Sequence, residues 1–278
     1  MTMIVEPGLS PLLQATTATT VVPKWTEETV LSMRRWSAKL FSFRTTRSAG
    51  FRFVPGQFAR LGIAVNPGDA GALVWRAYSM VSANYDEHLE FFSIVVPSGE
   101  FTTRLEQFVP GDRIFVEKMS YGFLTADRFA GGRDLWFLAS GTGLAPFLSI
   151  LHDPQIWIDY ENLFLVHSVR QADELVYREE IASLSSHALL CSGRARLRYI
   201  PVVTRESVAG ALTARLPQLI SDGRLEAATG VALDVERSRL MICGNPQMAS
   251  DMRDLLTSRG FRVGRRGNPG QLAFENYW

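Results

Sequence analysis

Residues 135–146 read LWFLASGTGLAP, an apolar run followed by a loop that contains two glycines. Five successive apolar residues are typical of a strand buried on both faces of a parallel sheet. Gly141 and Gly143, with Thr142 between them, would let the backbone come close to a pyrophosphate. Pro146 stands in place of the usual third glycine and suits the first turn of a helix. The pattern predicts a dinucleotide-binding loop, although a tight turn without a ligand stays open on this motif alone.

The chain changes character near residue 130. After it, apolar runs alternate with helical stretches, which is typical of an α/β domain with a parallel sheet. The predicted strands are 135–139, 163–166, 200–204 and 240–243, and the predicted helices are 146–152, 173–184 and 246–259. Before it, short strands between Gly/Pro turns predict an antiparallel β-barrel. Its predicted strands are 40–44, 58–63, 90–96 and 113–117, with one helix at 102–108.

Length and composition fit two folded domains. We divide the 278 residues into a mobile leader (1–20), a β-barrel domain (21–130) and a Rossmann-like parallel-sheet domain with a C-terminal tail (131–278). The net charge of +1 does not indicate a nucleic-acid partner. No apolar run reaches the roughly 20 residues of a membrane span, and the leader does not resemble a secretory signal. We therefore expect a cytoplasmic protein with no membrane partner.

The two cysteines and four histidines do not predict a metal site. Cys191 and Cys243 are too few for the usual four-thiolate iron–sulfur ligation, and no histidine lies at zinc-ligand spacing from them. A disulfide between the two cysteines is possible but not required, and free thiols are expected in a reducing compartment.

Three arginines favour NADP(H) over NAD(H) as the dinucleotide. Arg170 and Arg205 end the second and third predicted parallel strands, and Arg215 follows shortly after. The carboxyl ends of such strands meet at the cofactor crevice, where a guanidinium group can bind the 2′-phosphate through paired hydrogen bonds. No acidic residue ends the second strand, where an NAD enzyme often has one. The alternative is that these arginines are ordinary solvated residues.

The stretch Arg76-Ala77-Tyr78-Ser79 is suited to a flavin. An aromatic ring can stack on the isoalloxazine, the neighbouring hydroxyl can hydrogen-bond its N5/O4 edge, and an arginine can neutralise a pyrophosphate. An ordinary strand segment is the alternative for this motif taken alone.

Together these motifs resemble the ferredoxin–NADP reductase family, and within it the bacterial ferredoxin/flavodoxin reductases. The resemblance covers nearly the whole chain after the leader. The motifs that carry it are Pro55–Phe58, Arg76–Ser79, Val96–Leu105, Pro110–Asp112, Gly141–Phe147, Val166–Arg170, Val203–Glu206, Cys243–Met248 and Glu275–Trp278.

The resemblance implies FAD in the barrel domain and NADP(H) in the α/β domain. Residues implied to hold FAD are Arg76, Tyr78, Ser79, Ile94, Val95, Thr102 and Thr103. Residues implied to hold NADP(H), besides the Gly141–Gly143 loop, are Arg170, Arg205, Arg215 and Gly244. Tyr78, Ser79 and Cys243 are the implied catalytic residues, although a buried cysteine is more often a small apolar residue. In the tail, Trp278 is implied to stack on the FAD adenine, with Ala273 or Phe274 nearer the flavin ring; Trp278 packing on the surface is the alternative.

The implied activity is that of an FAD-dependent oxidoreductase between NADPH and ferredoxin or flavodoxin. Hydride would pass from the nicotinamide C4 to flavin N5, and single electrons would then pass to an acidic carrier. Candidate docking residues for that carrier are Arg47, Arg52, Arg104, Arg265 and Arg266. We expect a monomer. The alternatives are a stand-alone reductase component of an oxygenase system, since two cysteines exclude a fused [2Fe–2S] domain, and a non-catalytic flavin-binding sensor module.

Overall fold

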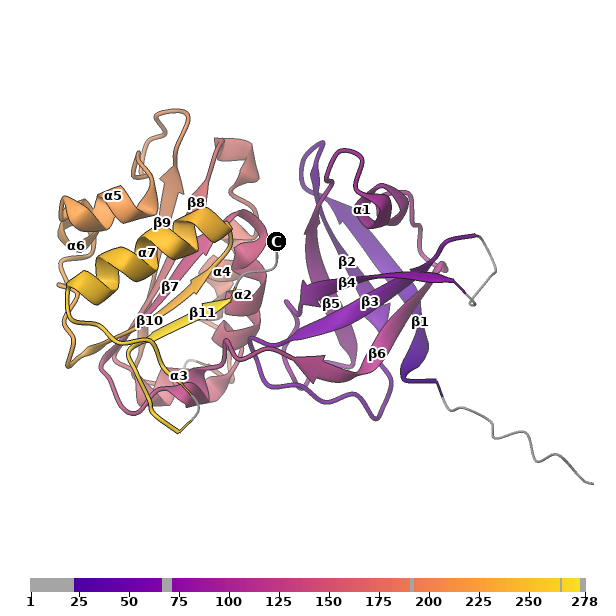
Figure 1. The fold of residues 1–278 in the computed structure, drawn as a ribbon, viewed down its shortest axis with the longest axis horizontal. Helices are drawn as coiled ribbons and strands as arrows, with labels where there is room; N and C mark the ends of the chain where they lie inside the picture. The colour runs from indigo at the N-terminus through magenta and orange to yellow at the C-terminus, as the bar shows by residue number, and fades with distance from the viewer. Residues whose placement is uncertain (1–22, 67–71, 191–192, 266, 276–278) are drawn as a thin grey trace, which may run out of the picture.

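The computed structural model describes residues 23–66, 72–190, 193–265 and 267–275, so the predicted leader lies outside the described residues. Two sheets form two lobes that lie side by side (Figure 1). The antiparallel sheet has the strand order β4-β3-β6-β1-β2-β5. Its strands are β1 (Trp25–Arg35), β2 (Leu40–Thr46), β3 (Phe58–Ala64), β4 (Leu73–Ser79), β5 (His88–Ile94) and β6 (Arg113–Tyr121).

The antiparallel sheet curls around an aromatic core in the manner of a barrel. Phe41, Phe43 and Phe91 are buried inside it and belong to one hydrophobic cluster. The edge strands β4 and β5 meet only through an isolated bridge between Met80 and Phe91, so the hydrogen-bonded ladder is not closed. The short helix α1 (Glu100–Leu105) buries Phe101 and Leu105 against this core. The predicted antiparallel barrel is therefore confirmed as an incompletely closed one.

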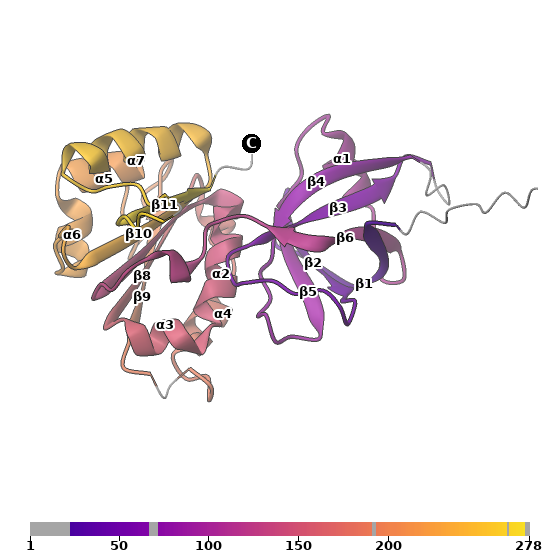
Figure 2. The same cartoon turned by 60° about the horizontal axis from the view of Figure 1, so that its bottom comes forward.

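The second sheet is parallel, with the order β11-β10-β7-β8-β9, and helices cover both of its faces (Figure 2). Its strands are β7 (Asp134–Ser140), β8 (Asn162–Val169), β9 (Arg196–Val203), β10 (Ser238–Cys243) and β11 (Leu272–Glu275). Its helices are α2 (Ala145–Leu151), α3 (Pro154–Asp159), α4 (Arg178–Leu184), α5 (Leu216–Ser221), α6 (Arg224–Thr229) and α7 (Pro246–Ser258).

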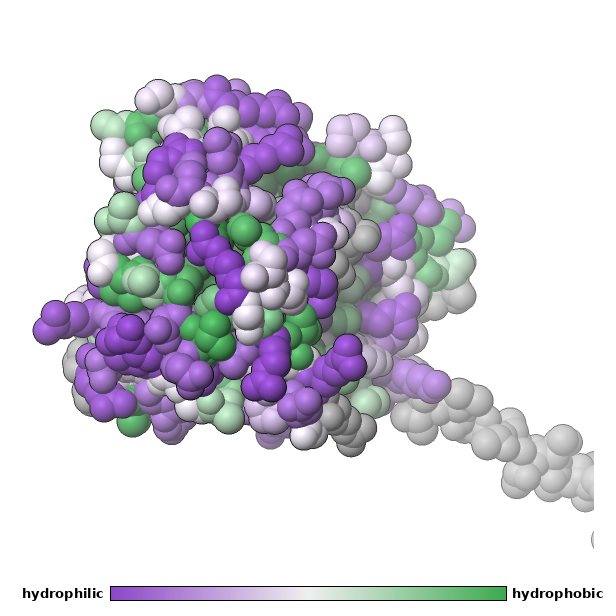
Figure 3. Space-filling model, turned by 60° about the vertical axis from the view of Figure 1, so that its left-hand side comes forward, coloured by the Kyte–Doolittle hydropathy of each residue, from purple (hydrophilic) through white to green (hydrophobic). Residues whose placement is uncertain are grey.

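Strand β7 shows why an uninterrupted apolar run was needed here. Phe137 packs into the cluster shared with α2, α3 and α4, whereas Trp136 and Leu138 pack into the cluster shared with α5, α6 and α7. Successive side chains of a strand point to opposite faces, so a sheet covered on both sides requires apolar residues at every position. The outer surface of this lobe is mostly hydrophilic, with smaller hydrophobic areas between (Figure 3).

One predicted helix is wrong. The stretch 173–184 is not continuous: a 3₁₀ turn at Ala172–Glu174 is followed by α4, and Tyr177 between them has a positive φ of 61°. A positive φ is unfavourable for a bulky residue, so tertiary contacts must hold it. The Tyr177 ring lies 5.4 Å from that of Phe92 in β5, and its hydroxyl donates to Glu90 Oε1 at 2.9 Å.

That tyrosine belongs to a packed contact between the two lobes. Glu90 also pairs with Arg44 at 2.7 Å, and Ser149 of α2 donates its hydroxyl to the Ser82 carbonyl at 2.8 Å. The cluster around α2 and α4 includes Phe92 of the antiparallel lobe. Buried hydrogen bonds and shared apolar packing thus hold the two lobes together. These contacts fix the relative position of the residues that the two lobes present to each other.

No helix in the described ranges is both long and apolar enough to cross a bilayer. The antiparallel sheet ends at Tyr121 and the parallel sheet begins at Asp134. The division at residues 130/131 stays a prediction within that connecting segment.

Candidate active site

A cavity of about 410 Å³ lies between the two lobes and receives residues from both. This volume is within the range of small-molecule sites, roughly 300–1,000 Å³. The antiparallel lobe lines it with Arg76, Ala77, Tyr78, Ser79, Phe92, Ser93, Ile94, Val96, Gly99, Glu100, Phe101 and Thr102. The α/β lobe lines it with Thr142, Gly143, Ala145 and Gly244. The predicted flavin motif and nucleotide loop therefore face one shared space.

The α/β residues reach the cavity because of the strand order. The chain runs outward from β7 through β8 to β9, and then continues on the other side of β7 with β10 and β11. The strand order therefore reverses between β7 and β10, and the loops after these two strands lie at a topological switch point. Open α/β sheets bind ligands at such points. Thr142 and Gly143 come from the first of these loops, and Gly244 comes from the second.

The two loops approach each other so closely that glycine is required in both. A Cβ on Gly143 would lie 2.4 Å from the Cys243 carbonyl oxygen, and one on Gly244 would lie 2.2 Å from Ser140 Oγ. Ser140 Oγ also accepts the Asn245 N–H at 2.8 Å. Ser140 thus ties the loops together, a role that the sequence did not reveal because serine at a strand end is common.

His167 contacts the backbone of the nucleotide loop through a hydrogen bond to Gly141. Its side chain is fully buried in β8, with Nε2 3.2 Å from the Gly141 carbonyl oxygen and Nδ1 3.4 Å from the Tyr199 hydroxyl. Burial lowers the pKa of His167 to about 4, so the ring is neutral at pH 7. A neutral ring that donates from Nε2 to Gly141 fixes a residue whose φ is +55°. The sequence shows no ligand spacing for this histidine and did not indicate its part in the loop.

Tyr78 and Ser79 form the flavin-motif wall of the cavity. The Tyr78 hydroxyl lies 3.0 Å from Ser93 Oγ, and burial raises the pKa of Tyr78 to about 12, so the ring stays neutral. Ser79 is 7% exposed and lines the cavity, and its hydroxyl has no hydrogen-bond partner in the described part of the chain. A nearly buried hydroxyl facing a cavity is ready to bond a polar ligand edge. Arg76, which is exposed, lines the same wall.

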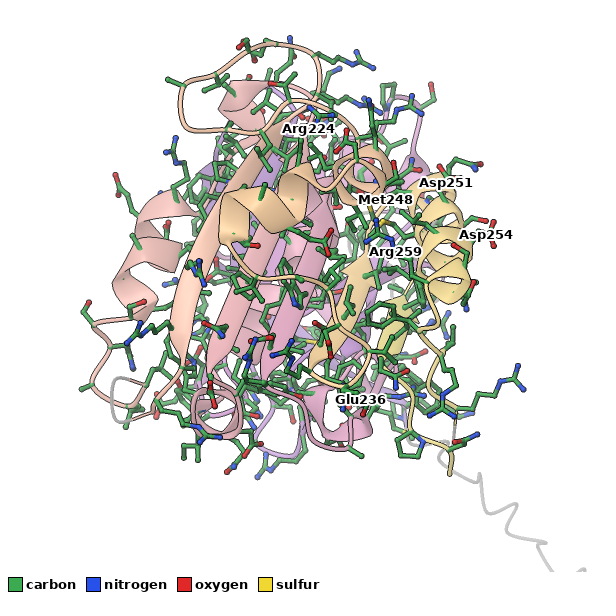
Figure 4. All side chains as sticks on the ribbon, turned by 90° about the vertical axis from the view of Figure 1, so that its left-hand side faces the viewer. Arg224, Glu236, Met248, Asp251, Asp254 and Arg259 are labelled. Atoms are coloured by element: carbon green, nitrogen blue, oxygen red, sulfur yellow. The ribbon has the colours of Figure 1, made fainter. Side chains whose placement is uncertain are left out.

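Arg170 and Arg205 lie side by side beyond the ends of β8 and β9. The ladder between these strands continues with Thr204 N to Val169 O and Arg205 N to Arg170 O, both at 3.0 Å. Arg215 directly precedes α5. Arg224, labelled in Figure 4, donates to the Thr213 carbonyl at 3.0 Å and so anchors the segment before Arg215.

The three side chains are available to a ligand. Arg170, Arg205 and Arg215 are exposed, and across the described ranges their guanidinium groups make no hydrogen bond or ion pair. Unpaired guanidinium groups at the carboxyl edge of the sheet favour a phosphate dianion.

Comparison with known proteins identifies the family. A family model described as "Oxidoreductase NAD-binding domain" matches residues 137–254. The chain is 44% identical to Ferredoxin–NADP reductase A of Sorangium cellulosum (strain So ce56) over 258 residues, which are 92% of this chain and 91% of that protein. The chain belongs to the ferredoxin–NADP reductase family. It is also 40% identical to the Ferredoxin–NADP reductase of Pseudomonas aeruginosa over 252 residues, 89% of this chain and 95% of that protein.

A solved structure in this family has the same fold. The crystal structure of a ferredoxin NADP⁺ reductase from Neisseria gonorrhoeae, which has bound FAD and NADP, matches with a TM-score of 0.85 at 37% identity. The match covers 92% of this chain and 100% of that chain. Membership of the ferredoxin–NADP reductase family, and the two-lobe fold expected for it, are confirmed.

Within this reductase fold, several predicted flavin residues differ in their placement. Ile94 lines the cavity, whereas Val95 does not and donates its N–H to the Lys39 carbonyl at 2.8 Å. Helix α1 begins at Glu100, two residues before the predicted start, so both threonines lie inside it. Thr102 still lines the cavity, but Thr103 donates its hydroxyl to the Gly99 carbonyl at 2.8 Å and does not.

The predicted residues at the ends of β10 and β11 are divided. Gly244 lines the cavity, whereas the Cys243 side chain is fully buried in the core behind it, where burial and Glu275 raise the pKa of its thiol well above the usual value. Ala273 is buried in β11, and Phe274 packs against Arg253, whose guanidinium carbon lies 4.1 Å from the ring centroid. Neither of these two lines the cavity, and Trp278 lies outside the described residues. Their contacts with a flavin stay predictions.

Replacement of His167 by glutamine should remove an acid-labile part of the stability. The folded pKa of about 4 lies below the usual 6.5, so the neutral form stabilises the fold above pH 6.5 and this contribution is lost as the pH falls towards 4. From pH 7 to pH 5, the wild type should lose about 2 kcal/mol of unfolding free energy more than the glutamine variant. Urea unfolding at both pH values measures the difference.

Glutamine is the matched replacement because its amide N–H can still donate to the Gly141 carbonyl. His152, whose pKa burial also lowers, is present in both proteins and cancels in the comparison. Equal losses in wild type and variant would show that His167 is not a buried neutral histidine.

Proposed function

We propose that this chain catalyses electron transfer between NADPH and a ferredoxin or flavodoxin, with FAD as its prosthetic group. The observation that carries this proposal is the single cavity lined by Arg76–Ser79 on one side and by Thr142, Gly143 and Gly244 on the other. A hydride donor and its acceptor must be stacked within near-attack distance, and only a shared cavity allows this. FAD supplies the ability to accept two electrons as hydride and to release them singly.

The residues present fit a flavin and a nicotinamide dinucleotide. Ser79 offers a buried hydroxyl that has no hydrogen-bond partner among the described residues, which suits the polar N5/O4 edge of the flavin. Tyr78 offers a neutral ring that its bond to Ser93 orients against the cavity. Gly143 and Gly244 keep the opposite wall free of side chains, so a flat ring can lie against backbone.

Each lobe is proposed to bind one of the two cofactors. The FAD-binding part would be residues 21–130 and the NADP(H)-binding part residues 131–278. Arg170, Arg205 and Arg215 would hold the 2′-phosphate, because within the described ranges they are unpaired cations beyond the carboxyl ends of the parallel strands. One chain completes both walls of the cavity, so the proposed reaction needs no second copy, and a monomer stays the proposal. Cys243 is a free thiol among the described residues, whereas Cys191, the possible disulfide partner, lies outside them. A reducing cytoplasmic location stays the proposal.

The carrier would dock through exposed arginines, because an acidic carrier is attracted to a basic rim. Arg47 is committed elsewhere, since it donates to the carbonyls of Phe51, Asn84 and Asp86. Arg104 likewise donates to the Val65 carbonyl and pairs with Glu100. Arg266 lies outside the described residues. Arg52 is committed in the same way, since it donates to the carbonyls of Ala49 and Phe51. The exposed Arg265 remains as the proposed docking residue.

Carrier reduction by the FAD-loaded protein tests the proposal. With NADPH in excess, the protein should reduce a ferredoxin or a flavodoxin catalytically, followed by the absorbance change of the carrier. Oxidation of NADPH with ferricyanide but with neither carrier would favour the reductase component of an oxygenase. Absence of NADPH oxidation with any acceptor would favour the sensor module.

A further inference from the structure

Two carboxylates lie close in sequence to Arg170 and Arg205, and across the described ranges neither forms an ion pair with them. Glu174 follows Arg170 by four residues, and Glu206 directly follows Arg205. Carboxylates and guanidinium groups this close in sequence can form ion pairs. Here both carboxylates accept backbone N–H groups instead.

The accepted N–H groups all belong to the loop after β8. Glu174 Oε2 accepts from Arg170 N at 2.8 Å and from Gln171 N at 3.4 Å. Glu206 Oε1 accepts from Ala172 N at 2.6 Å. Hydrogen bonds to an ionised acceptor are about twice as strong as neutral ones. Two charged side chains, Glu174 from the same loop and Glu206 from the loop after β9, therefore fix the backbone that carries Arg170.

We propose that Glu174 and Glu206 are positioning residues that set the preference for NADPH over NADH. This inference rests on the proposed function, because it concerns the same 2′-phosphate site. The first effect is on the arginines: each carboxylate bound to backbone N–H is withheld from Arg170 and Arg205, whose charges stay available to phosphate.

The second effect is on the wrong cofactor. A ribose with a free 2′-hydroxyl is best bound by a carboxylate acceptor, as in many NAD enzymes. Glu174 Oε2 and Glu206 Oε1 accept N–H groups of the loop, which holds each carboxylate against the loop backbone and hinders it from turning towards a ribose hydroxyl. The same bonds thus favour binding of NADPH through its 2′-phosphate and disfavour binding of NADH, whose ribose has a free 2′-hydroxyl. Specificity commonly combines attraction of one ligand with rejection of another.

Two double variants separate positioning from charge. Glu174→Ala with Glu206→Ala removes both the charge and the acceptors. Glu174→Gln with Glu206→Gln removes the charge but keeps an amide oxygen for each N–H. The readout is the affinity of the FAD-loaded full chain for adenosine 2′,5′-bisphosphate and for 5′-AMP, measured by calorimetry. Glu226→Ala is the control, because Glu226 of α6 also accepts a backbone N–H, that of Leu233 at 2.8 Å, and its ion pair is with Arg259 and not with Arg170 or Arg205.

The alanine pair should lose about tenfold in affinity for adenosine 2′,5′-bisphosphate, with 5′-AMP unchanged. The glutamine pair and the Glu226 control should stay within about twofold of wild type, and the single alanine variants should fall between. Unchanged selectivity in the alanine pair and both singles would overturn the inference. So would tighter bisphosphate binding in both pairs, since that result would make the carboxylates mere repulsive charges.

The same measurements distinguish failure of the proposed NADP(H) site from failure of the inference about Glu174 and Glu206. If wild type does not prefer adenosine 2′,5′-bisphosphate over 5′-AMP, the NADP(H) site is wrong and the inference falls with it. If wild type shows that preference and the alanine pair keeps it, only the inference is wrong.

Discussion

Replacement of both Arg170 and Arg205 by alanine should lower kcat/KM for NADPH by about 10²–10³-fold. The two backbones are joined by the Arg205 N to Arg170 O bond, so their guanidinium groups start from adjacent positions. Neither has a protein partner among the described residues, so their charge is available to the 2′-phosphate. The loss should fall mainly on KM, because the 2′-phosphate lies far from the reacting ring. Steady-state kinetics with NADPH and ferricyanide measures it.

NADH provides the internal comparison, since it lacks the group that these arginines are proposed to bind. Its kcat/KM should stay within about twofold of the wild-type value. Arg237→Ala is a matched control, because Arg237 precedes β10 at the amino edge of the sheet and pairs with Asp234 there. Equal losses for NADPH and NADH in the double variant would mean that the arginines act on the fold and not on the phosphate.

Ser79→Ala should slow reduction of the flavin by NADPH about 100-fold while leaving FAD bound. The Ser79 hydroxyl faces the cavity with no hydrogen-bond partner in the described ranges, so it is free to bond the flavin edge where charge develops. Removal of one such preorganised donor costs a reaction far more than it costs binding. Rapid mixing of NADPH with the variant, followed at the flavin absorbance, gives the rate directly.

Ser82→Ala is the control for the loss of a buried serine, because Ser82 accepts the Glu90 N–H at 3.1 Å and does not line the cavity. Its flavin-reduction rate should remain close to that of wild type. A wild-type rate in Ser79→Ala, at full FAD content, would remove Ser79 from the catalytic residues.

The sequence was most informative where a local pattern has a single structural use. The run at 135–139 is typical of a strand in a sheet covered on both faces, and it forms the core of β7. Helix α7 was predicted within one residue, because its period places Met248 towards the core and Asp251 and Asp254 towards solvent (Figure 4). Arg170 and Arg205 met as predicted because parallel strands end at a common edge.

The sequence was least informative where distant contacts override local preference. Nothing near Tyr177 predicts its positive φ, which depends on Glu90 and Phe92 of the other lobe. Strand β11 has only four residues, and its pairing with β10 gives it its place. His167 became important only through its distance to Gly141, which lies in another strand–helix unit.

The most direct test of the account is an anaerobic titration of the FAD-loaded chain with NADPH and, separately, with NADH. The visible absorbance of the bound oxidised flavin should be lost at low NADPH and should persist at the same concentration of NADH. A chain that cannot be loaded with FAD, or a bound flavin that NADPH leaves oxidised, would contradict it.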